Sequence, residues 1–213
     1  MNIYIVRHGE TKSNEQGRLQ GWTNDPLNDM GVLLARETGK AMKGIRFNAV
    51  FSSSLVRAYN TAEIILRESG NDNPIQIDDR IKEICMGDFE GKKFKPGECE
   101  VDPAAVKQFF INPMEAPGFP NGESVRDVMA RTQDFLKDVA TKDYESVLIA
   151  THGCALRCML NFLYENPFDF WHGHVPYNCC VNVIEVKDGE LKLVEDDMIL
   201  YNKNLCVDRY ARF

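Results

Sequence analysis

Two segments far apart in the chain share one construction, an apolar run that stops at a histidine followed by glycine. The first covers residues 1–9 and reaches His8, and the second covers residues 146–153 and reaches His152. Unbroken runs of Ile, Val and Leu are typical of strands buried on both faces of a parallel sheet. Ligands bind just beyond the carboxyl ends of such strands. If the two strands are neighbours, both histidines meet at one edge, and this pairing predicts an enzyme.

Composition is consistent with one domain over residues 1–213, because a chain of this length with 44% hydrophobic residues can bury a large core. The apolar run at residues 1–6 is too short for the apolar core of a secretory signal peptide and lacks its basic flank. No apolar stretch approaches the length of a membrane span. The seven cysteines are odd in number and form no Cys-x-x-Cys pair, which predicts reduced thiols in a cytoplasmic protein. A net charge of −7 without a basic run argues against nucleic acid and anionic membranes as partners.

Strand and helix patterns alternate along the chain, which favours an α/β fold: a three-layer sandwich with a mostly parallel central sheet and helices on both faces. Further strands are predicted at 48–52 and near 75–77, and a hairpin at 180–186 and 190–194. Helices are predicted at 28–43, 55–69, 123–142 and 154–164, while residues 10–25 read as a polar loop. Residues 85–122 are rich in Gly and Pro, with one short helix at 103–111, and are interpreted as an insertion over the site.

Two arginines accompany the histidines. Arg7 directly precedes His8, and Arg57 lies on the first turn of the helix that follows the strand at 48–52. The planar, permanently charged guanidinium binds phosphate oxygens bidentately, and the first turn of a helix also favours anions. This combination predicts a site for a phosphoryl group rather than for a carboxylate or a metal.

The motifs around these residues resemble the histidine phosphatase superfamily, which includes cofactor-dependent phosphoglycerate mutases and several phosphatases. The resemblance spans residues 1–186, in order and with ordinary spacing. It rests on Arg7-His8-Gly9-Glu10-Thr11 with Asn14, Gln20-Gly21, Pro26-Leu27, Ser52-Ser53, Arg57-Ala58, Thr61-Ala62, Glu83, Gly87-Asp88-Phe89-Glu90-Gly91, Gly122-Glu123-Ser124 and Thr151-His152-Gly153.

The resemblance implies a role for each matched residue. His8 would attack phosphorus and form a phosphohistidine, a choice that only the resemblance makes between the two histidines. Arg7, Arg57 and His152 would hold the phosphoryl oxygens, and Glu83 would protonate the leaving group and then activate water. No cofactor or metal takes part in this scheme. Further contacts to the substrate, a small-molecule phosphate ester, are expected from Asn14, Gln20, Gly21, Gly153 and His174.

Three alternatives compete with a phosphatase. A mutase must grip a second phosphate, yet residues 92–123 contain four lysines, five acidic residues and no arginine, which favours hydrolysis. A non-catalytic phosphate-binding module would be expected to lose one of the four core residues, which this chain keeps. The third alternative, a metal-dependent hydrolase, would lose activity with a chelator. Separately, the side chains of His172 and His174 are two residues apart and could share a strand face that binds zinc.

The segment 198–213 departs from the family pattern. Its aromatic residues Tyr201, Tyr210 and Phe213 could pack against a partner chain, which would make the protein a homodimer.

Overall fold

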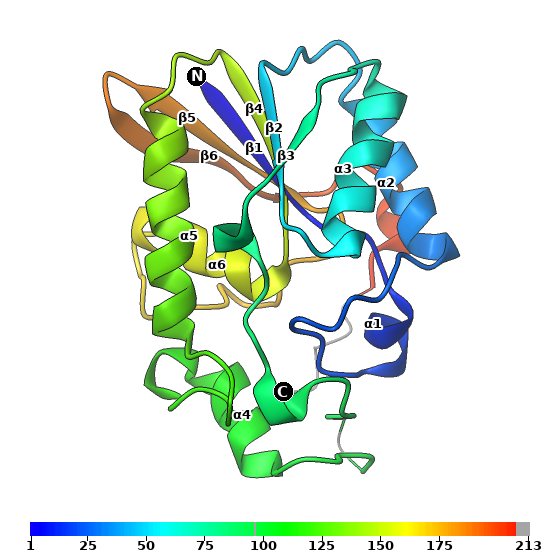
Figure 1. The fold of residues 1–213 in the computed structure, drawn as a ribbon, viewed down its shortest axis with the longest axis vertical. Helices are drawn as coiled ribbons and strands as arrows, with labels where there is room; N and C mark the ends of the chain where they lie inside the picture. Colours follow the sequence, from blue (N-terminus) through cyan, green and yellow to red (C-terminus); the bar gives the residue numbers. More distant parts are fainter. Residues whose placement is uncertain (96, 208–213) are drawn as a thin grey trace.

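A six-stranded mixed sheet forms the centre of the computed structural model, which describes residues 1–95 and 97–207 (Figure 1). The strand order is β3-β2-β4-β1-β5-β6. The first four strands in this order are parallel, and β5 and β6 form an antiparallel hairpin at the edge. The strands are β1 (Asn2–Arg7), β2 (Ala49–Ser52), β3 (Ile75–Ile77), β4 (Ser146–Thr151), β5 (Val181–Lys187) and β6 (Glu190–Met198).

Helices cover both faces of the sheet, as the alternating pattern predicts. On one face, α3 (Val56–Ser69) packs against strand residues such as Val50 and Leu148, and α2 (Asp29–Ala41) packs against α3. On the other, α5 (Val125–Ala140) and α6 (Gly153–Leu160) bury Phe135 and Leu156 against Ile3. Each face of the sheet is apolar because unbroken apolar strands present side chains alternately to both sides. The predicted three-layer α/β sandwich is confirmed.

Side-chain caps explain where the helices begin. The Asn28 side chain accepts a hydrogen bond from the Gly31 amide at 2.8 Å, so α2 starts at Asp29. Ser124 and Asp127 form a reciprocal capping box, so α5 starts at Val125 and not at residue 123. The predicted helix at 154–164 is too long, because α6 ends at Leu160 and a single 3₁₀ turn follows.

One helix was not predicted. α1 (Lys12–Gln16) lies within the stretch that reads as a polar loop, and its five residues carry no apolar periodicity. Its only local signal is a capping box between Thr11 and Asn14, with Gly17 in the left-handed conformation (φ 64°) at its end. The helix carries Asn14 to the end of β1, where Asn14 lines the same pocket as His8.

Residues 85–95 and 97–122 lie beyond the carboxyl ends of the parallel strands (Figure 1). They contain the predicted helix, α4 (Pro103–Ile111), which Asp102 caps, with Pro103 in its first turn. Phe109 of α4 shares an apolar cluster with Ala155 and Cys158 of α6. This segment is therefore packed onto the layer of the fold that bears the second histidine.

Tyr201 is the one aromatic residue of the segment 198–213 that falls within the described residues. Tyr201 is buried against Leu34 and Ala35 of the same chain, and its hydroxyl donates to the Asn178 carbonyl at 2.9 Å. The expectation that Tyr201 packs against a partner chain is therefore corrected. Tyr210 and Phe213 lie outside the described residues.

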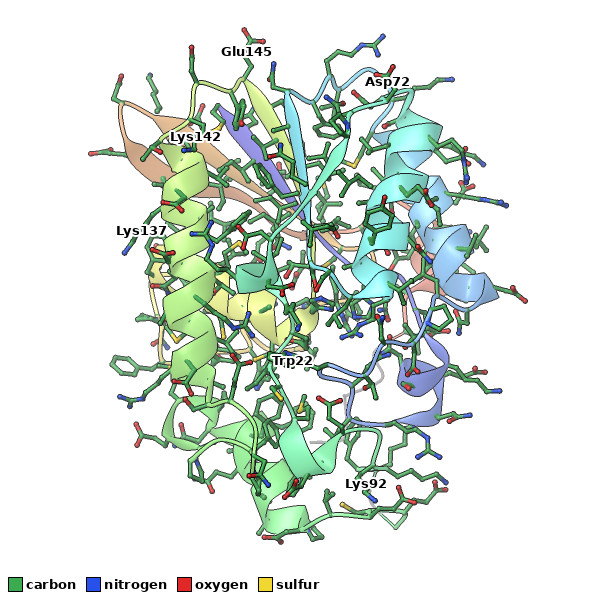
Figure 2. The ribbon with its side chains drawn as sticks, in the orientation of Figure 1. Trp22, Asp72, Lys92, Lys137, Lys142 and Glu145 are labelled. Atoms are coloured by element: carbon green, nitrogen blue, oxygen red, sulfur yellow. The ribbon has the colours of Figure 1, made fainter. Side chains whose placement is uncertain are left out.

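Charged side chains such as Asp72, Lys137 and Lys142 point outward from the helices and loops (Figure 2). Across the described residues, none of the helices combines the length and apolarity needed to traverse a bilayer.

Candidate active site

His8 and His152 follow directly on two neighbouring strands. β1 and β4 pair in parallel with Arg7 opposite Thr151, and the His8 amide donates to the Thr151 carbonyl at 2.9 Å. The two imidazole rings consequently lie with their centroids 5.1 Å apart. The predicted meeting of the two histidines at one edge of the sheet is confirmed.

The hydrogen bonds of His8 define which ring nitrogen is free to react. Its Nδ1 lies 2.7 Å from the Gly9 carbonyl, which can only accept, so Nδ1 carries the proton and Nε2 keeps its lone pair. The Arg57 Nε–H donates to that Nε2 at 3.3 Å. Burial first, and then the charges of Arg57 and Arg7, hold the pKa of His8 well below its ordinary value. His8 is thus a neutral imidazole with an oriented lone pair.

The hydrogen bonds of His152 indicate which of its ring nitrogens can donate to a ligand. Its Nε2 lies 2.8 Å from the Ser53 hydroxyl, and that hydroxyl oxygen accepts a hydrogen bond from the Leu55 amide at 3.2 Å. We assign the Ser53 proton to the hydrogen bond with His152 Nε2, which places the ring proton on Nδ1. Nδ1 is buried and finds no hydrogen-bond partner among the described residues. A buried donor of this kind is suited to a phosphoryl oxygen.

Both arginines are buried and fixed by backbone carbonyls. Arg57 is 0% exposed and donates to the carbonyls of Gly21 and Thr23, each at 2.7 Å. Burial lowers the pKa of Arg57 to about 10, so the guanidinium stays charged at neutral pH. Arg7 donates to the Pro176 carbonyl and is 4% exposed. Two oriented positive charges therefore flank His8.

Glu83 is fixed at the amino end of α6. Its carboxylate accepts hydrogen bonds from the amides of Ile84 (2.9 Å), Cys154 (3.1 Å) and Ala155 (2.9 Å). Backbone amides at the start of a helix are natural partners for an anion. The side chain nevertheless lines the pocket described below, so it faces the space next to the histidines.

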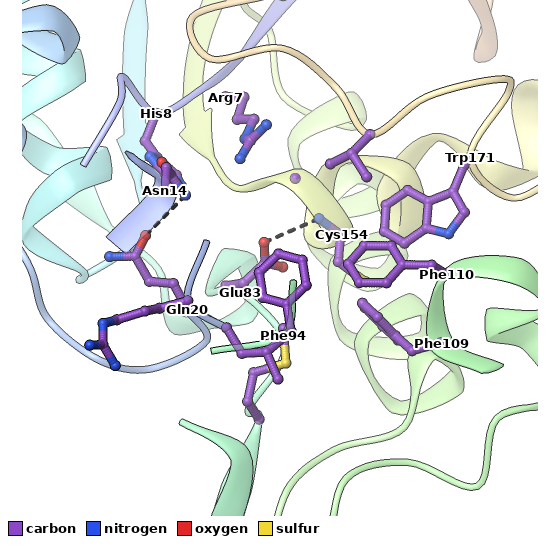
Figure 3. Close-up of a pocket in the computed structure, with 15 residues that line it drawn as sticks. Arg7, His8, Asn14, Gln20, Glu83, Phe94, Phe109, Phe110, Cys154 and Trp171 are labelled. Atoms are coloured by element: carbon purple, nitrogen blue, oxygen red, sulfur yellow. Dashed lines mark hydrogen bonds between the residues drawn. The ribbon is translucent and has the colours of Figure 1, made fainter. Parts of the chain in front are cut away.

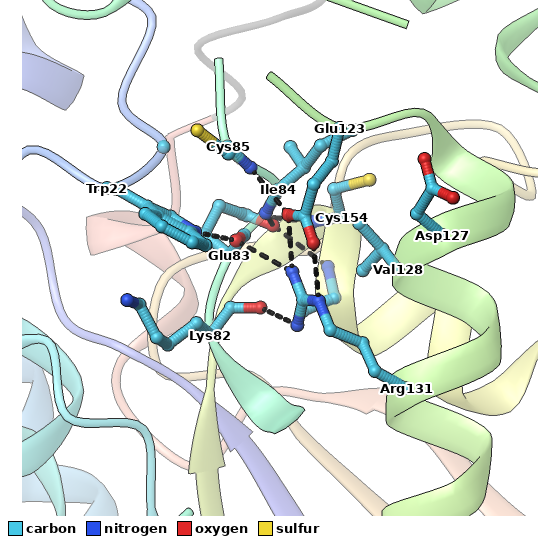
Figure 4. Close-up of polar contacts among 12 residues, drawn as sticks. Trp22, Lys82, Glu83, Ile84, Cys85, Glu123, Asp127, Val128, Arg131 and Cys154 are labelled. Carbon is cyan, nitrogen blue, oxygen red and sulfur yellow. Dashed lines mark hydrogen bonds and ion pairs between the residues drawn. The ribbon is translucent and has the colours of Figure 1, made fainter. Parts of the chain in front are cut away.

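The backbone around Glu83 is braced by a residue that sequence reasoning missed. Arg131 of α5 donates to the carbonyls of Arg80, Lys82 and Glu83 at 2.6–2.9 Å, and its guanidinium pairs with Glu123 (Figure 4). Glu123 in turn accepts from the Cys85 amide at 2.8 Å. Glu123 lies in the segment Gly122-Glu123-Ser124, one of the motifs that carry the family resemblance. This motif was the sequence feature from which the contact with Arg131 could have been suspected.

A second brace fixes the loop that holds Arg57. The Glu90 carboxylate accepts hydrogen bonds at 2.7–3.1 Å from the amides of Gly21, Trp22, Thr23 and Met86 and from the Thr23 hydroxyl. The carbonyls of this same loop orient Arg57. A methyl group at Gly21 would collide with the Ile84 carbonyl and with Glu90, so the loop can approach this closely only with glycine.

We expect Glu90→Gln to lower kcat/KM about 10-fold to 100-fold and to weaken competitive inhibition by inorganic phosphate. The glutamine amide cannot accept hydrogen bonds through its nitrogen, so part of the loop loses its partners and Arg57 shifts. Steady-state kinetics with phosphate as inhibitor measure this effect. Asp88→Asn is the matched control, because Asp88 accepts only from the exposed Asn121 side chain among the described contacts. Unchanged kinetics in Glu90→Gln would rule out this positioning role.

A pocket opens in front of His8 and Arg7 (Figure 3). Of the predicted substrate-binding residues, Asn14, Gln20 and Gly153 line it. Gly21 is not among the lining residues and acts behind the site, through its carbonyl contact with Arg57. His174 is also absent from the lining: its ring stacks on Tyr177, and its Nε2 lies 3.4 Å from Asp197. The pocket also contains Arg18 and an aromatic wall that sequence reasoning missed.

The two histidines at 172 and 174 face different partners. The His172 ring stacks on Tyr164 with centroids 3.6 Å apart, whereas His174 faces Asp197. Within residues 1–95 and 97–207, no three His, Cys, Asp or Glu side chains gather in a group that could hold a metal ion. The zinc alternative for this pair therefore has no third ligand in the described chain.

The buried histidines predict a loss of stability in mild acid. Burial holds the pKa values of His8 and His152 well below 6.5, so below that pH the unfolded chain binds protons that the folded chain refuses. We expect the free energy of unfolding to be greatest above pH 6.5 and to fall as pH decreases, by up to roughly 1.4 kcal/mol per pH unit for each histidine. Urea unfolding between pH 7.5 and 5 measures the slope. His8→Asn should remove the contribution of His8 to the pH dependence of the free energy of unfolding. An identical slope in this variant would show that the pKa of His8 is not lowered in the folded protein.

Comparison with known proteins agrees with this geometry. The family model of the histidine phosphatase superfamily (branch 1) matches residues 3–197. A metal-independent phosphoserine phosphatase of Arabidopsis thaliana is 35% identical over 193 residues, which cover 87% of this chain and 76% of that protein. The probable phosphoglycerate mutase GpmB of Proteus mirabilis is 32% identical over 162 residues, covering 76% of this chain and 74% of that protein. The solved structure of Bacillus stearothermophilus YhfR superposes with a TM-score of 0.84 at 32% identity, covering 92% of this chain and 96% of that chain. The chain belongs to branch 1 of the histidine phosphatase superfamily.

Proposed function

We propose that this protein is a phosphatase that hydrolyses small-molecule phosphomonoesters through a phosphohistidine on His8. The observation that carries the proposal is the state of the His8 ring. Its Nδ1 proton is held by the Gly9 carbonyl, and its Nε2 accepts from Arg57, which with His152 is not among the residues that line the pocket but lies directly behind the His8 ring. An imidazole prepared in this way can attack phosphorus without first losing a proton.

In the first step, the Nε2 lone pair forms a bond to phosphorus as the bond between phosphorus and the ester oxygen breaks. Glu83 gives its proton to that oxygen, which leaves as an alcohol. Arg7, Arg57 and the Nδ1–H of His152 donate hydrogen bonds to the three phosphoryl oxygens, whose charge is stabilised through the transition state. Asn14 and Gly153 line the same end of the pocket and contribute to its shape.

In the second step, water attacks phosphorus while the Glu83 carboxylate takes its proton. The bond between phosphorus and Nε2 breaks, its electron pair returns to the ring, and inorganic phosphate leaves. Glu83 is then protonated again and His8 is neutral, so the site is ready for another cycle. The open pocket admits the water that this step needs.

The uncharged residues that 85–122 contributes to the pocket support hydrolysis over a mutase reaction, in which the phosphoryl group is transferred to a second acceptor. A mutase must hold a second anionic group, and the residues that 85–122 contributes to the pocket are Met86, Phe94, Phe109 and Phe110, none of them charged. Among the described residues of the lining, Arg18 is the only cation besides Arg7, since the histidine is neutral, and it already donates to the Gly91 carbonyl at 2.7 Å. The relationship to mutases keeps this second activity as a candidate to be measured.

Release of phosphate from p-nitrophenyl phosphate and a panel of biological phosphomonoesters, with and without EDTA, tests the proposal. We expect turnover that EDTA leaves unchanged. Turnover abolished by the chelator would instead support a metal-dependent hydrolase, and binding of phosphate without any turnover would support a non-catalytic module. Incubation of 3-phosphoglycerate with catalytic 2,3-bisphosphoglycerate tests the mutase alternative, which predicts 2-phosphoglycerate in place of free phosphate.

We further propose that residues 1–213 form one domain in which 85–122 cover the site, and that the protein acts in the cytoplasm. The covering role of 85–122 is supported by the position of Phe94, Phe109 and Phe110 in the pocket. The cytoplasmic location is supported by the seven cysteines, which are all free thiols. A homodimer stays a prediction, which light scattering of the purified chain would test.

A further inference from the structure

A buried cluster of charged side chains lies outside the pocket, and the mechanism proposed above does not use it. The side chain of Arg157 in α6 is 0% exposed, and it pairs with Asp196 at 3.2 Å and with Asp197 of β6. None of these three residues lines the pocket. A buried ion pair adds little net stability, because taking both charges out of water costs about as much as their attraction returns. The cluster is therefore better explained by what it holds in place.

The cluster holds His174 through both its backbone and its ring. The guanidinium of Arg157 donates to the His174 carbonyl at 3.4 Å. The Nε2 of His174 lies 3.4 Å from the Asp197 carboxylate, and the ring stacks on Tyr177 with centroids 4.5 Å apart. Side chains from α6 and β6 thus fix the beginning of the segment 174–179.

The later part of the segment 174–179 holds Arg7. The Pro176 carbonyl accepts a hydrogen bond from the Arg7 guanidinium, which lines the pocket next to His8 (Figure 3). The Cys179 amide donates to the Arg7 carbonyl at 3.1 Å, so the segment also fixes the backbone of this arginine. Any displacement of the segment therefore reaches the guanidinium.

We propose that Asp197 and Arg157 are positioning residues that hold Arg7 in the orientation in which it binds a phosphoryl group. The two residues fix His174, and the segment that follows places the Pro176 carbonyl. That carbonyl aims the guanidinium, whose planar fork binds phosphate oxygens well only in the correct orientation. The inference depends on the proposed function only in taking Arg7 as a ligand of the phosphoryl group.

Asp197→Asn tests this role because it removes the charge and keeps the shape. Asp197 has a left-handed backbone (φ 46°), which asparagine adopts readily, and its amide donates to the Asn182 side chain at 3.0 Å. Asp196 remains to balance Arg157, so we expect the variant to fold. In a phosphorus NMR titration, its Kd for inorganic phosphate should rise about 10-fold, the scale of one weakened hydrogen bond to a charged group.

Two further variants accompany this measurement. Asp188→Asn is the matched control, because Asp188 also has a left-handed backbone (φ 53°) but is exposed in the turn between β5 and β6, and it should leave the Kd unchanged. His174→Phe replaces Asp197→Asn if that variant does not fold. Its ring can still stack on Tyr177 but loses the contact with Asp197, so the Kd should rise by a smaller factor.

A double-mutant cycle with Arg7→Met separates positioning from a general structural effect. If Asp197 acts through Arg7, Asp197→Asn should raise the Kd no further in the Arg7→Met background. The NMR signal of the Arg7 Nε–H, identified by its loss in Arg7→Met, should shift in Asp197→Asn and keep its position in Asp188→Asn. An unchanged Kd in folded Asp197→Asn, or additive effects of the two substitutions in the cycle, would overturn the positioning role.

Phosphate binding does not require turnover, so the failure of this inference can be distinguished from the failure of the proposed phosphatase. Coupling between Asp197 and Arg7 in a protein that hydrolyses no ester would overturn the proposed hydrolysis and keep the positioning role. Ester hydrolysis with additive effects in the cycle would do the reverse. Absence of phosphate binding to the unaltered chain would overturn both, because Arg7 would then hold no phosphoryl group.

Discussion

Replacing His8 with alanine is expected to lower kcat/KM for every phosphomonoester by about 10⁵-fold, the scale on which removal of a catalytic nucleophile acts in other hydrolases. The neighbouring groups cannot substitute for it. His152 keeps its proton on Nδ1, and the lone pair of its Nε2 accepts from the Ser53 hydroxyl at 2.8 Å, a closer contact than the 3.3 Å one from Arg57 that His8 Nε2 must give up. Water could attack directly, but without the orientation that β1 and the Gly9 carbonyl give to the ring. Phosphate release measured over a wide range of enzyme concentrations tests this expectation.

His172→Ala is the matched control for that experiment. His172 stacks on Tyr164 and is absent from the pocket lining, so its removal should leave kcat/KM within about a factor of two. Circular dichroism and a melting curve would establish that both variants are folded. Activity retained in folded His8→Ala would show that the nucleophile lies elsewhere.

Replacing Glu83 with glutamine is expected to reduce kcat/KM for alkyl esters by about 10²-fold to 10⁴-fold, the usual contribution of a general acid and base. The loss should be much smaller when hydrolysis of p-nitrophenyl phosphate is limited by departure of p-nitrophenolate, which leaves without a proton. Glutamine has nearly the same shape and keeps one oxygen that can accept from the amides of Ile84 and Ala155. Parallel assays with 2-phenylethyl phosphate and p-nitrophenyl phosphate measure the difference.

Glu145→Gln serves as the control, because this carboxylate is exposed in the turn before β4 and absent from the pocket lining. Equal losses on both substrates in Glu83→Gln would contradict proton transfer to the leaving group. They would assign Glu83 a structural role at the amino end of α6 instead.

The centre of the site could be predicted because it depends on backbone topology. Unbroken apolar runs identify β1 and β4 as buried strands, and parallel strands deliver whatever follows them to the same edge. His8 and His152 come together for that reason. Arg57 follows β2 in the same sheet, so its approach to His8 obeys the same rule.

The braces and the pocket wall could not be predicted in this way, because they join segments without any periodic relation. Glu90 reaches back to the loop at 21–23, and Arg131 reaches from α5 to the carbonyls around Glu83. The stack of Phe94, Phe110 and Trp171 draws on three separate segments. His174 illustrates the converse: its place in the sequence before Tyr177 predicted an approach to the substrate, but its ring contacts Asp197 and Tyr177 and is absent from the pocket lining.

Trapping of the phosphorylated enzyme tests the central claim most directly. The protein is mixed with a radiolabelled phosphomonoester, quenched within milliseconds in denaturant at alkaline pH, where phosphohistidine survives and acyl phosphates do not, and digested for peptide mapping. We predict label on the peptide that contains His8, its loss on mild acid treatment, and no label in His8→Ala. Rapid turnover without any labelled peptide, or label on a residue other than His8, would contradict the account.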